Sequence, residues 1–311
     1  MNRAVVLGPL LMFGTLAVAA GLQAQRGPAG PTGPTPAGIA AATIEKVKDN
    51  LYMIGGSGLG DTFSGGNIAV FITDTGVVLV DTKNAGYGPT ILDRVKTVTD
   101  KPVTTIINTH SHGDHTGSNE FFSANVESVV QENTKANMEK MNAFKGEKAQ
   151  FLPKKTYKDK MSLGSGKNKI DLYYFGPGHT GGDTWVVFPA LRTMHTGDMF
   201  VWKGQPVIDA NNGGSGVQYP ATLSKALTTI KNVDTLIPGH APLMTWNDLK
   251  EYTEFNKEFL AWAEGEMKAG KSADEAAAEY RIPEKYRDYK IVPFGAGLKG
   301  NTQTIYNELK K

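Results

Sequence analysis

The most informative stretch of this 311-residue sequence is Thr109-His110-Ser111-His112-Gly113-Asp114-His115-Thr116-Gly117. It follows the β-branched segment 103–107, which is predicted to be a buried strand, and Gly113 permits a tight turn. Three imidazoles and one carboxylate between positions 110 and 115 can point into two adjacent pockets. Neutral imidazole nitrogen and carboxylate oxygen suit zinc. The stretch therefore predicts a metal centre at the end of a strand.

Three further candidate ligands lie downstream, each directly after a predicted strand: His179, Asp198 and His240. Five of the six histidines lie in the first cluster or beside a glycine. Burying so many imidazoles without a metal would leave polar groups unpaired. A purely structural zinc site is the other alternative, but such sites are usually closed and rich in thiolates. Because the chain has no cysteine, the set favours two ions with open positions.

Hydrophobic periodicity predicts alternating strands and helices over the rest of the chain. Strands are expected at 67–72, 77–81, 103–107, 126–130, 170–175, 184–188, 193–198 and 235–238. Helices are expected at 87–98, 131–141, 220–230, 249–268, 273–280 and from 302 onward. Two strand-rich halves, each followed by helices, indicate an α/β protein with two sheets packed face to face and helices outside. The loops that carry the chemistry then collect at one edge of this sandwich.

Net charge and composition limit the classes of binding partner that are expected. The formal net charge is +2, and no dense run of Lys and Arg is present, which argues against nucleic acid as a partner. A small-molecule substrate is expected instead, and the oligomeric state is left open. The absence of cysteine excludes disulfides and thiolate nucleophiles.

The N-terminus has the pattern of an export signal. Arg3 precedes an apolar run, 4–20, and small residues follow, so residues 1–24 are predicted to be a signal peptide cleaved after Ala24. An uncleaved membrane anchor is the alternative, because the run approaches the roughly 18 residues that span a bilayer. Either interpretation places the folded part in the periplasm or outside the cell, and cleavage leaves no stable membrane association. The Gly/Pro-rich residues 25–42 are expected to be a disordered linker.

The run from Thr109 to Gly117 resembles the His-x-His-x-Asp-His motif of the metallo-β-lactamase superfamily. The later Gly-His, Gly-Asp and Gly-His pairs occur in the order of that family, and the hairpin at 67–81 resembles its opening strands. This resemblance covers about 43–246. It implies a catalytic domain with the four-layer αβ/βα sandwich of the metallo-β-lactamase fold, to which residues 247–311 would add a helical C-terminal extension packed on the domain.

The resemblance also implies a ligand set for two Zn²⁺ per chain. His110, His112 and His179 would hold the first ion, while Asp114, His115 and His240 would hold the second, with Asp198 bridging. A water between two such ions becomes a hydroxide nucleophile near neutral pH. Asp114 is the best candidate to orient it and to pass its proton to the leaving group. Asp81 would accept a hydrogen bond from a ligating imidazole, and His195 is expected near the ligands without being one.

The predicted substrate contacts rest on loops. The glycine-rich segment 55–63 is expected to be a mobile flap that presents Leu59 and Phe63 over the metals, with a plain linker as the alternative. Trp202 is expected to form a floor of the pocket, and Lys203 to meet a substrate carboxylate. Surface packing and a solvated lysine explain these two residues equally well. Backbone amides of the loop 209–216 could line the site, and a polar surface turn is an equal alternative.

The absence of cysteine rules out the β-lactamase subclasses that bind the second zinc through cysteine. The aspartate in Gly197-Asp198-Met199-Phe200 is more similar to glyoxalase II, lactonases and general hydrolases of the superfamily. The expected function is an exported zinc hydrolase of a small acyl bond in a β-lactam, a lactone or a thioester. The alternatives are a glyoxalase II-like thioesterase, an iron-dependent oxidase or dioxygenase on the same scaffold, and a non-catalytic zinc-binding module.

Overall fold

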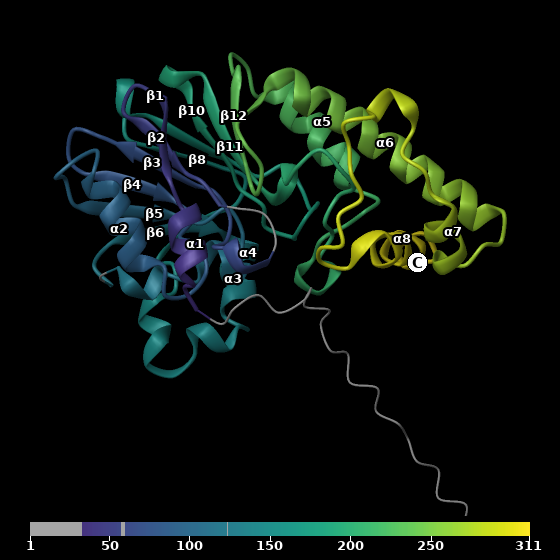
Figure 1. Cartoon of the computed structure of the whole chain (residues 1–311), viewed down its shortest axis with the longest axis horizontal. Helices are drawn as coiled ribbons and strands as arrows, with labels where there is room; N and C mark the ends of the chain where they lie inside the picture. The colour runs from purple at the N-terminus through teal and green to yellow at the C-terminus, as the bar shows by residue number, and fades with distance from the viewer. Residues whose placement is uncertain (1–32, 57–59, 123) are drawn as a thin grey trace, which may run out of the picture.

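A computed structural model describes residues 33–56, 60–122 and 124–311. The predicted signal peptide, the first part of the predicted linker and Leu59 lie outside these residues. The described part holds two sheets with helices on both outer faces, which confirms the predicted αβ/βα sandwich (Figure 1). No helix within the described ranges is long and apolar enough to cross a membrane.

The first sheet follows chain order. Its strands are β1 (Ile44–Lys48), β2 (Leu51–Ile54), β3 (Ile68–Ile72), β4 (Val77–Val80), β5 (Val103–Ile107), β6 (Glu127–Gln131) and β7 (Lys155–Tyr157). Strands β1 to β4 pair antiparallel, and β4 to β7 pair parallel. The hairpin predicted at 67–81 is present, with Ile72 of β3 opposite Val77 of β4.

The second sheet contains six strands. They are β8 (Lys160–Leu163), β9 (Ile170–Tyr173), β10 (Trp185–Phe188), β11 (Thr193–Gly197), β12 (Thr235–Pro238) and β13 (Met244–Thr245). All neighbours pair antiparallel except β11 and β12, which are parallel. The short strands β1, β2, β7, β8 and β13 were not among the predicted ones.

The helices cover both outer faces and the loops between strands. They are α1 (Pro36–Ala41), α2 (Gly88–Lys96), α3 (Gly113–Thr116), α4 (Glu132–Met138), α5 (Tyr219–Thr229), α6 (Trp246–Lys268), α7 (Ala273–Glu279) and α8 (Gly297–Leu309). Helix α8 begins before the predicted Thr302, because buried Asn301 and Thr302 pack in its first turns and override the low helix propensity of its glycines.

Strand alternation builds the layers. Along β10, Val186 and Phe188 face the core between the sheets, while Trp185 and Val187 face outward onto α5 and α6. Along β3 and β4 the outward residues meet α2 in the same way. Because successive strand side chains point to opposite faces, a run of four apolar residues marks a strand covered on both sides.

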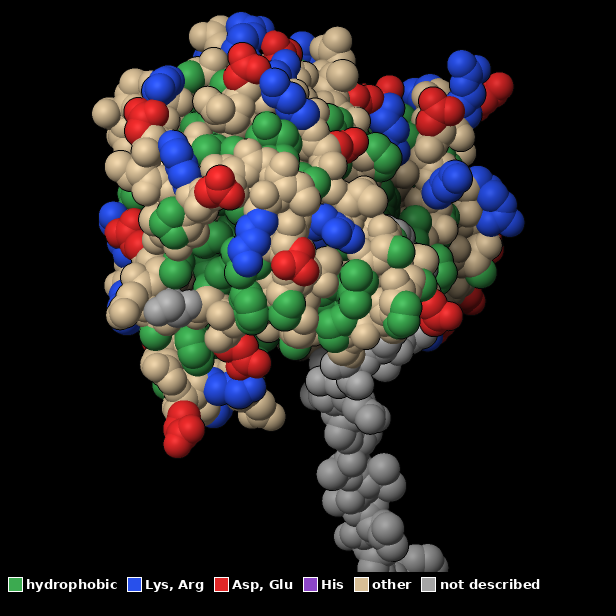
Figure 2. Space-filling model, turned by 60° about the vertical axis from the view of Figure 1, so that its left-hand side comes forward, with side chains coloured by type: hydrophobic (Ala, Val, Ile, Leu, Met, Phe, Trp, Pro, Cys, Tyr) green, Lys and Arg blue, Asp and Glu red, His purple; other side chains and the backbone are tan. Residues whose placement is uncertain are grey.

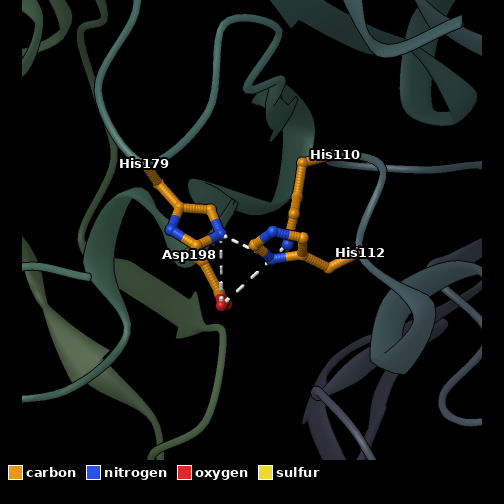
Figure 3. A group of neighbouring side chains, drawn as sticks. All are labelled: His110, His112, His179 and Asp198. Atoms are coloured by element: carbon orange, nitrogen blue, oxygen red, sulfur yellow. Dashed lines mark hydrogen bonds and ion pairs between the residues drawn. The ribbon is translucent and has the colours of Figure 1, made fainter. Parts of the chain in front are cut away.

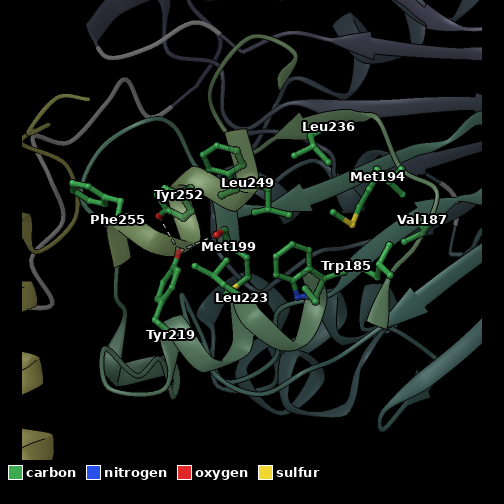
Figure 4. Packing of buried hydrophobic residues seen from close by; sticks show 14 of the residues in the cluster. Trp185, Val187, Met194, Met199, Tyr219, Leu223, Leu236, Leu249, Tyr252 and Phe255 are labelled. Carbon is green, nitrogen blue, oxygen red and sulfur yellow. Dashed lines mark hydrogen bonds between the residues drawn. The ribbon is translucent and has the colours of Figure 1, made fainter. Parts of the chain in front are cut away.

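The C-terminal extension shares this core. Leu249, Tyr252 and Phe255 of α6 pack with Trp185 and Leu223 over the second sheet (Figure 4). Figure 1 shows α6, α7 and α8 on the side of the second sheet that faces away from the first. The C-terminal extension therefore shares a hydrophobic core with the second sheet.

The prediction of a disordered linker up to residue 42 is wrong for residues 33–42. Thr35 accepts a hydrogen bond from Gly38 N at 2.9 Å and caps α1, and Pro36 begins the helix. A threonine cap followed by proline at the first position is a strong helix start. Ala42 is fully buried against the first sheet, so the chain is already part of the core there.

The face of the molecule in Figure 2 carries Lys and Arg side chains interspersed with Asp and Glu, without a large patch of one sign. No histidine side chain is visible on this face. Four of the histidine side chains are fully buried: His110, His115, His179 and His195.

Candidate metal centre

Strand direction explains why distant residues meet at one edge. Strands β4 and β5 are parallel in the first sheet, as are β11 and β12 in the second. The carboxyl ends of such strands meet at the same edge, and the loops that follow them face one another across the sandwich. Asp81 follows β4, the histidine cluster follows β5, Asp198 follows β11 and His240 follows β12.

The first group of side chains contains His110, His112, His179 and Asp198, whose candidate ligand atoms all lie within 4.8 Å of one another. Figure 3 shows the three imidazoles and the carboxylate turned toward a common centre. His112 Nδ1 and His179 Nε2 are 3.0 Å apart, and His179 Nε2 is 3.7 Å from Asp198 Oδ2.

The second group contains Asp114, His115 and His240, again within 4.8 Å. His240 Nε2 lies 3.2 Å from Asp114 Oδ2 and 3.2 Å from His115 Nε2. Asp198 also reaches this group, with Oδ1 at 3.3 Å from His115 Nε2 and Oδ2 at 3.4 Å from His240 Nε2. The structure thus brings all seven predicted ligands together, and Asp198 lies between the two groups.

Asp81 fixes the proton positions of two imidazoles. Its Oδ2 accepts a hydrogen bond from His115 Nδ1 at 2.7 Å and another from the Thr109 hydroxyl at 2.8 Å. Since that hydroxyl donates to Asp81, it accepts from His110 Nδ1 at 3.0 Å. Both imidazoles therefore carry their proton on Nδ1, and both Nε2 lone pairs face the site.

The remaining imidazoles of the first group are oriented by other acceptors. His112 Nε2 donates to Asp209 Oδ2 at 2.7 Å, and His179 Nδ1 donates to the carbonyl of Val207 at 2.7 Å. The lone pairs of His112 Nδ1 and His179 Nε2 then face one another. Two acceptors at 3.0 Å are a favourable pair only when a proton or a cation lies between them.

Two buried atoms test whether these residues fit a metal. Within the described part of the chain, His110 Nε2 and Asp198 Oδ1 have no hydrogen-bond partner. His115 Nε2 lies 3.3 Å from Asp198 Oδ1 but does not form a hydrogen bond with it. Buried polar atoms without partners are rare. Imidazole and carboxylate donors with free lone pairs fit divalent cations, and zinc among them.

The charges of the site also suit a cation. Burial acts to raise the pKa of Asp198, but the imidazoles of His240 and His115 outweigh it and hold that pKa well below its usual range. Burial acts to lower the pKa of His240, but Asp198 and Asp114 raise it to about 9. Burial lowers the pKa of His110 well below its usual range. Carboxylates that stay ionised in the interior attract positive charge, and in the metal-free protein the imidazolium of His240 supplies part of it.

Glycines permit the close packing of these groups. A Cβ on Gly239 would lie 1.9 Å from Asp198 Oδ1, and a Cβ on Gly66 would lie 2.2 Å from the ring of His115. Asp81 itself has a positive φ of 69°, a conformation that a residue with a side chain adopts only at some cost. The backbone at this edge is held in place by the surrounding contacts rather than by its own preference.

His195 belongs to neither group of candidate ligands. It is fully buried, donates from Nε2 to the carbonyl of Asn67 at 3.1 Å, and accepts from Gly197 N at 3.0 Å. It therefore holds the turn that leads into Asp198. Tyr219 of α5 supports the same turn, because its hydroxyl donates to the carbonyl of Asp198 at 3.0 Å.

Two of the predicted substrate contacts, Phe63 and Trp202, lie beside the ring of His240. Phe63 stacks on His240 with ring centroids 5.8 Å apart, and Trp202 lies 6.3 Å from the same ring. That Lys203 meets a substrate carboxylate stays a prediction. Its ammonium pairs with Asp248 at 2.7 Å and with Glu251 at 3.5 Å on α6.

Three supporting residues were not identified from the sequence. Asp209 orients His112, Asn67 donates to the carbonyls of Pro238 and Ala241 on either side of His240, and Asp183 accepts from Thr180 beside His179. Asp209 was visible only as one polar residue of a glycine-rich loop. No spacing rule links it to a histidine 97 positions away.

Comparison with known proteins places these features in a family. The family model described as "Metallo-beta-lactamase superfamily" matches residues 61–240. "Metallo-beta-lactamase type 2" of Elizabethkingia meningoseptica is 29% identical over 213 residues, which are 63% of this chain and 78% of that protein. "Metallo-beta-lactamase IND-1" of Chryseobacterium indologenes is 25% identical, over 62% of this chain and 80% of that protein.

Solved structures give the same fold. The metallo-beta-lactamase from Pontibacter korlensis has a TM-score of 0.59 and 19% identity, covering 69% of this chain and 98% of its own. The inverting sec-alkylsulfatase Pisa1 from Pseudomonas sp. has a TM-score of 0.68 and 16% identity, covering 86% of this chain and 50% of its own. Residues 1–246 are less than 86% of this chain, so the part that matches Pisa1 must include some of the C-terminal helices.

Proposed function

Because this chain belongs to the metallo-β-lactamase superfamily, a superfamily of metal-dependent hydrolases, we propose that it is a two-zinc hydrolase of small acyl substrates. The substrate class is a β-lactam, a lactone or a thioester. β-Lactams come first for testing, because the curated relatives carry the name metallo-beta-lactamase.

One observation carries the proposal: the carboxylate of Asp198 lies between two groups of imidazoles. Its oxygens are within 4.0 Å of Nε2 of four histidines, two from each group. His110, His112 and His179 would hold one ion, and Asp114, His115 and His240 the other, with Asp198 shared. Two bound divalent cations supply Lewis acidity and an acidified water.

The protein's own side chains orient the imidazoles and transfer the proton. Asp81, Asp209 and the carbonyl of Val207 keep the imidazole protons away from the centre, so that lone pairs face it. Asp114 is partly exposed, with 15% of its side chain accessible, and can accept a proton from the attacking water. As the bond from the acyl carbon to the leaving nitrogen, oxygen or sulfur breaks, Asp114 gives this proton to the leaving atom.

The chemistry of the donors supports zinc over thiolate-selective metals, since all candidate ligands are nitrogen or oxygen. Imidazole and carboxylate also accept iron, so elemental analysis of protein isolated without added metal is part of the test. About two zinc ions per chain are expected. A predominance of iron would instead favour the oxidase or dioxygenase alternative.

The activity test uses zinc-loaded protein from residue 25 to the C-terminus and a panel of chromogenic β-lactams, lactones and thioesters. Asp114→Asn should lower kcat by about 100-fold or more, because a general acid–base group contributes that much. Asp93→Asn, an exposed aspartate on α2, is the matched control and should change nothing. Chelation should abolish turnover. Full activity in metal-free protein, or no turnover of any compound on the panel, would overturn the proposal.

Export forms a separate part of the proposal and rests on residues 1–24 of the sequence. Cell fractionation compares the full chain with a chain that lacks residues 2–24. The full chain should appear outside the cytoplasm, shortened at its N-terminus. Retention of the full chain in the cytoplasm would contradict export without touching the hydrolase assignment.

A further inference from the structure

Three aromatic rings from three separate segments gather beside the second metal group. Phe63 lies at the end of the glycine-rich loop, Trp202 follows the turn after Asp198, and Phe294 comes from the C-terminal extension between α7 and α8. Phe294 is 5.9 Å from the ring of His240, 6.2 Å from Phe63 and 5.6 Å from Trp202. Each of these three aromatic side chains is half-buried, so each keeps part of its surface accessible.

The position of Phe294 is fixed by backbone contacts to the segment that follows Asp198. Lys290 N donates to the carbonyl of Lys203 at 3.0 Å, and Gln205 both accepts from Val292 N at 3.0 Å and donates to its carbonyl. In Figure 1 the yellow chain returns along α6 before it descends to α8. The segment that carries Phe294 is therefore held in place by the hydrogen bonds of Lys290 and Val292.

The rings are arranged as walls rather than as one packed stack. Phe63 is nearly parallel to His240, with 26° between the planes, whereas Phe294 is inclined by 63° to Phe63 and Trp202 by 84° to Phe294. Inclined and edge-to-face arrangements leave faces and edges that attract a further ring. Lys203, the cation that follows Trp202 in the chain, pairs with Asp248 and Glu251 instead of the rings. The wall thus suits an uncharged group.

We propose that the C-terminal extension completes the substrate site: Phe294, together with Trp202 and Phe63, forms an aromatic subsite for an uncharged aryl group beside the scissile acyl bond. This inference rests on the proposed hydrolase function and specifies its substrate class. His240 connects the aromatic subsite with the metal centre, because it belongs to the second metal group and its ring lies next to all three aromatic rings. An aryl group on the wall therefore lies next to the reacting centre.

The test uses pairs of substrates with the same scissile bond, with and without an aryl group. Benzylpenicillin and 6-acetamidopenicillanic acid form the lactam pair, γ-phenyl and γ-methyl butyrolactone the lactone pair, and phenylacetyl and acetyl thioesters of one thiol the third pair. The wild-type protein should favour the aryl member in kcat/KM by about 10-fold or more. Phe294→Ala should lose about 10-fold on the aryl member, mainly through KM, and less than about 2-fold on the other.

Matched variants separate recognition from structure. Phe294→Tyr keeps the ring and should restore the preference, while Phe294→Leu keeps bulk without a ring and should not. Ile291→Ala removes an exposed apolar side chain of the same segment and should leave kinetics unchanged. Each variant is checked for its melting temperature and zinc content. Equal losses on both members of a pair, or an unchanged preference in Phe294→Ala, would overturn the subsite.

A binding measurement keeps the subsite testable if the hydrolase proposal itself fails. Phenylacetate and acetate are titrated calorimetrically into the full chain, with and without zinc. Phenylacetate should bind at least about 10-fold more tightly than acetate to the wild-type protein, and this difference should disappear in Phe294→Ala. Equal binding of the two acids would exclude the aryl subsite, whereas missing turnover with retained aryl binding would refute only the hydrolysis of these compounds.

Discussion

The imidazole of His112 and the carboxylate of Asp209 are joined by a hydrogen bond of 2.7 Å from Nε2 to Oδ2. This bond places the Nδ1 lone pair of His112 toward His179 and Asp198. It also ties the loop after β5 of the first sheet to a loop that follows β11 of the second. The geometry of the first metal group thus depends on contacts across the sandwich.

Asp209→Ala should therefore weaken one metal site more than the other. Loss of a carboxylate that orients a ligating imidazole typically lowers metal affinity by about 10- to 100-fold. After dialysis against a weak chelator, the variant should retain about one zinc ion per chain where the wild type retains two. Asp209→Asn keeps an acceptor and should lose less. Unchanged occupancy in Asp209→Ala would show that His112 does not need this partner.

Asn301 of α8 should affect the same site from a greater distance. Its side chain accepts from Ile208 N at 3.4 Å and donates to the carbonyl of Pro206, so it holds the backbone on both sides of Val207. Because Val207 orients His179 and the adjoining Asp209 orients His112, Asn301→Ala should lower zinc affinity by about 3- to 10-fold. Chelator competition measures this change.

The matched control for Asn301 is Gln303→Ala, an exposed residue of the same helix, which should bind zinc like the wild type. The double variant Asp209→Ala/Asn301→Ala should lose less affinity than the two single losses combined, since both act through the same segment. Fully additive losses would argue against a shared route.

The sequence predicted the layers and the residues that gather at the candidate metal centre, because both follow from local patterns. Strands covered on both faces appear as continuous apolar runs, such as 77–80, and the candidate ligands follow strand ends closely. The edge strands were missed because Lys155–Tyr157 and Lys160–Leu163 are short and carry lysines, which resembles an ordinary polar loop.

The supporting groups could not be predicted for a different reason. Asp209 and Asn301 act through contacts between segments that are far apart in the chain, and a single sequence carries no record of such pairing. The ion pairs of Lys203 are of the same kind, because the two acidic residues of α6 that pair with it, Asp248 and Glu251, come from a distant segment of the chain.

The shared core makes a prediction about stability. Leu249 of α6 is fully buried over the second sheet, so Leu249→Ala should lower the free energy of unfolding by about 2–5 kcal/mol. Leu309→Ala, at a side chain that is 37% exposed, should change it by less than about 0.5 kcal/mol. Urea unfolding followed by circular dichroism measures both. A separate early transition for the C-terminal helices in the wild type would contradict a common core.

A buried lysine beneath the second metal group gives the protein an unusual dependence on pH. The ammonium of Lys83 is fully buried and donates to the carbonyls of Gly55 at 2.9 Å and Gly66 at 3.0 Å, the two ends of the loop that carries Phe63. Burial lowers the pKa of Lys83 to about 7, although the carboxylates of Asp114 and Asp81 act to raise it. In the unfolded chain this pKa returns toward 10.5.

Between about pH 7 and 10.5 the unfolded chain therefore binds more protons at Lys83 than the folded chain does, and folding stability rises with pH across this window. Relative to Lys83→Met, metal-free wild-type protein should gain at most about 1.4 kcal/mol of stability per pH unit in the window. Below about pH 7 the difference should be constant and least favourable to the wild type. Urea denaturation at a series of pH values measures the difference, with the exposed Lys96→Met on α2 as the control. A difference that does not change between pH 7 and pH 10 would mean that Lys83 keeps its ordinary titration in the folded protein, and that the loop ends are held by a charged ammonium throughout.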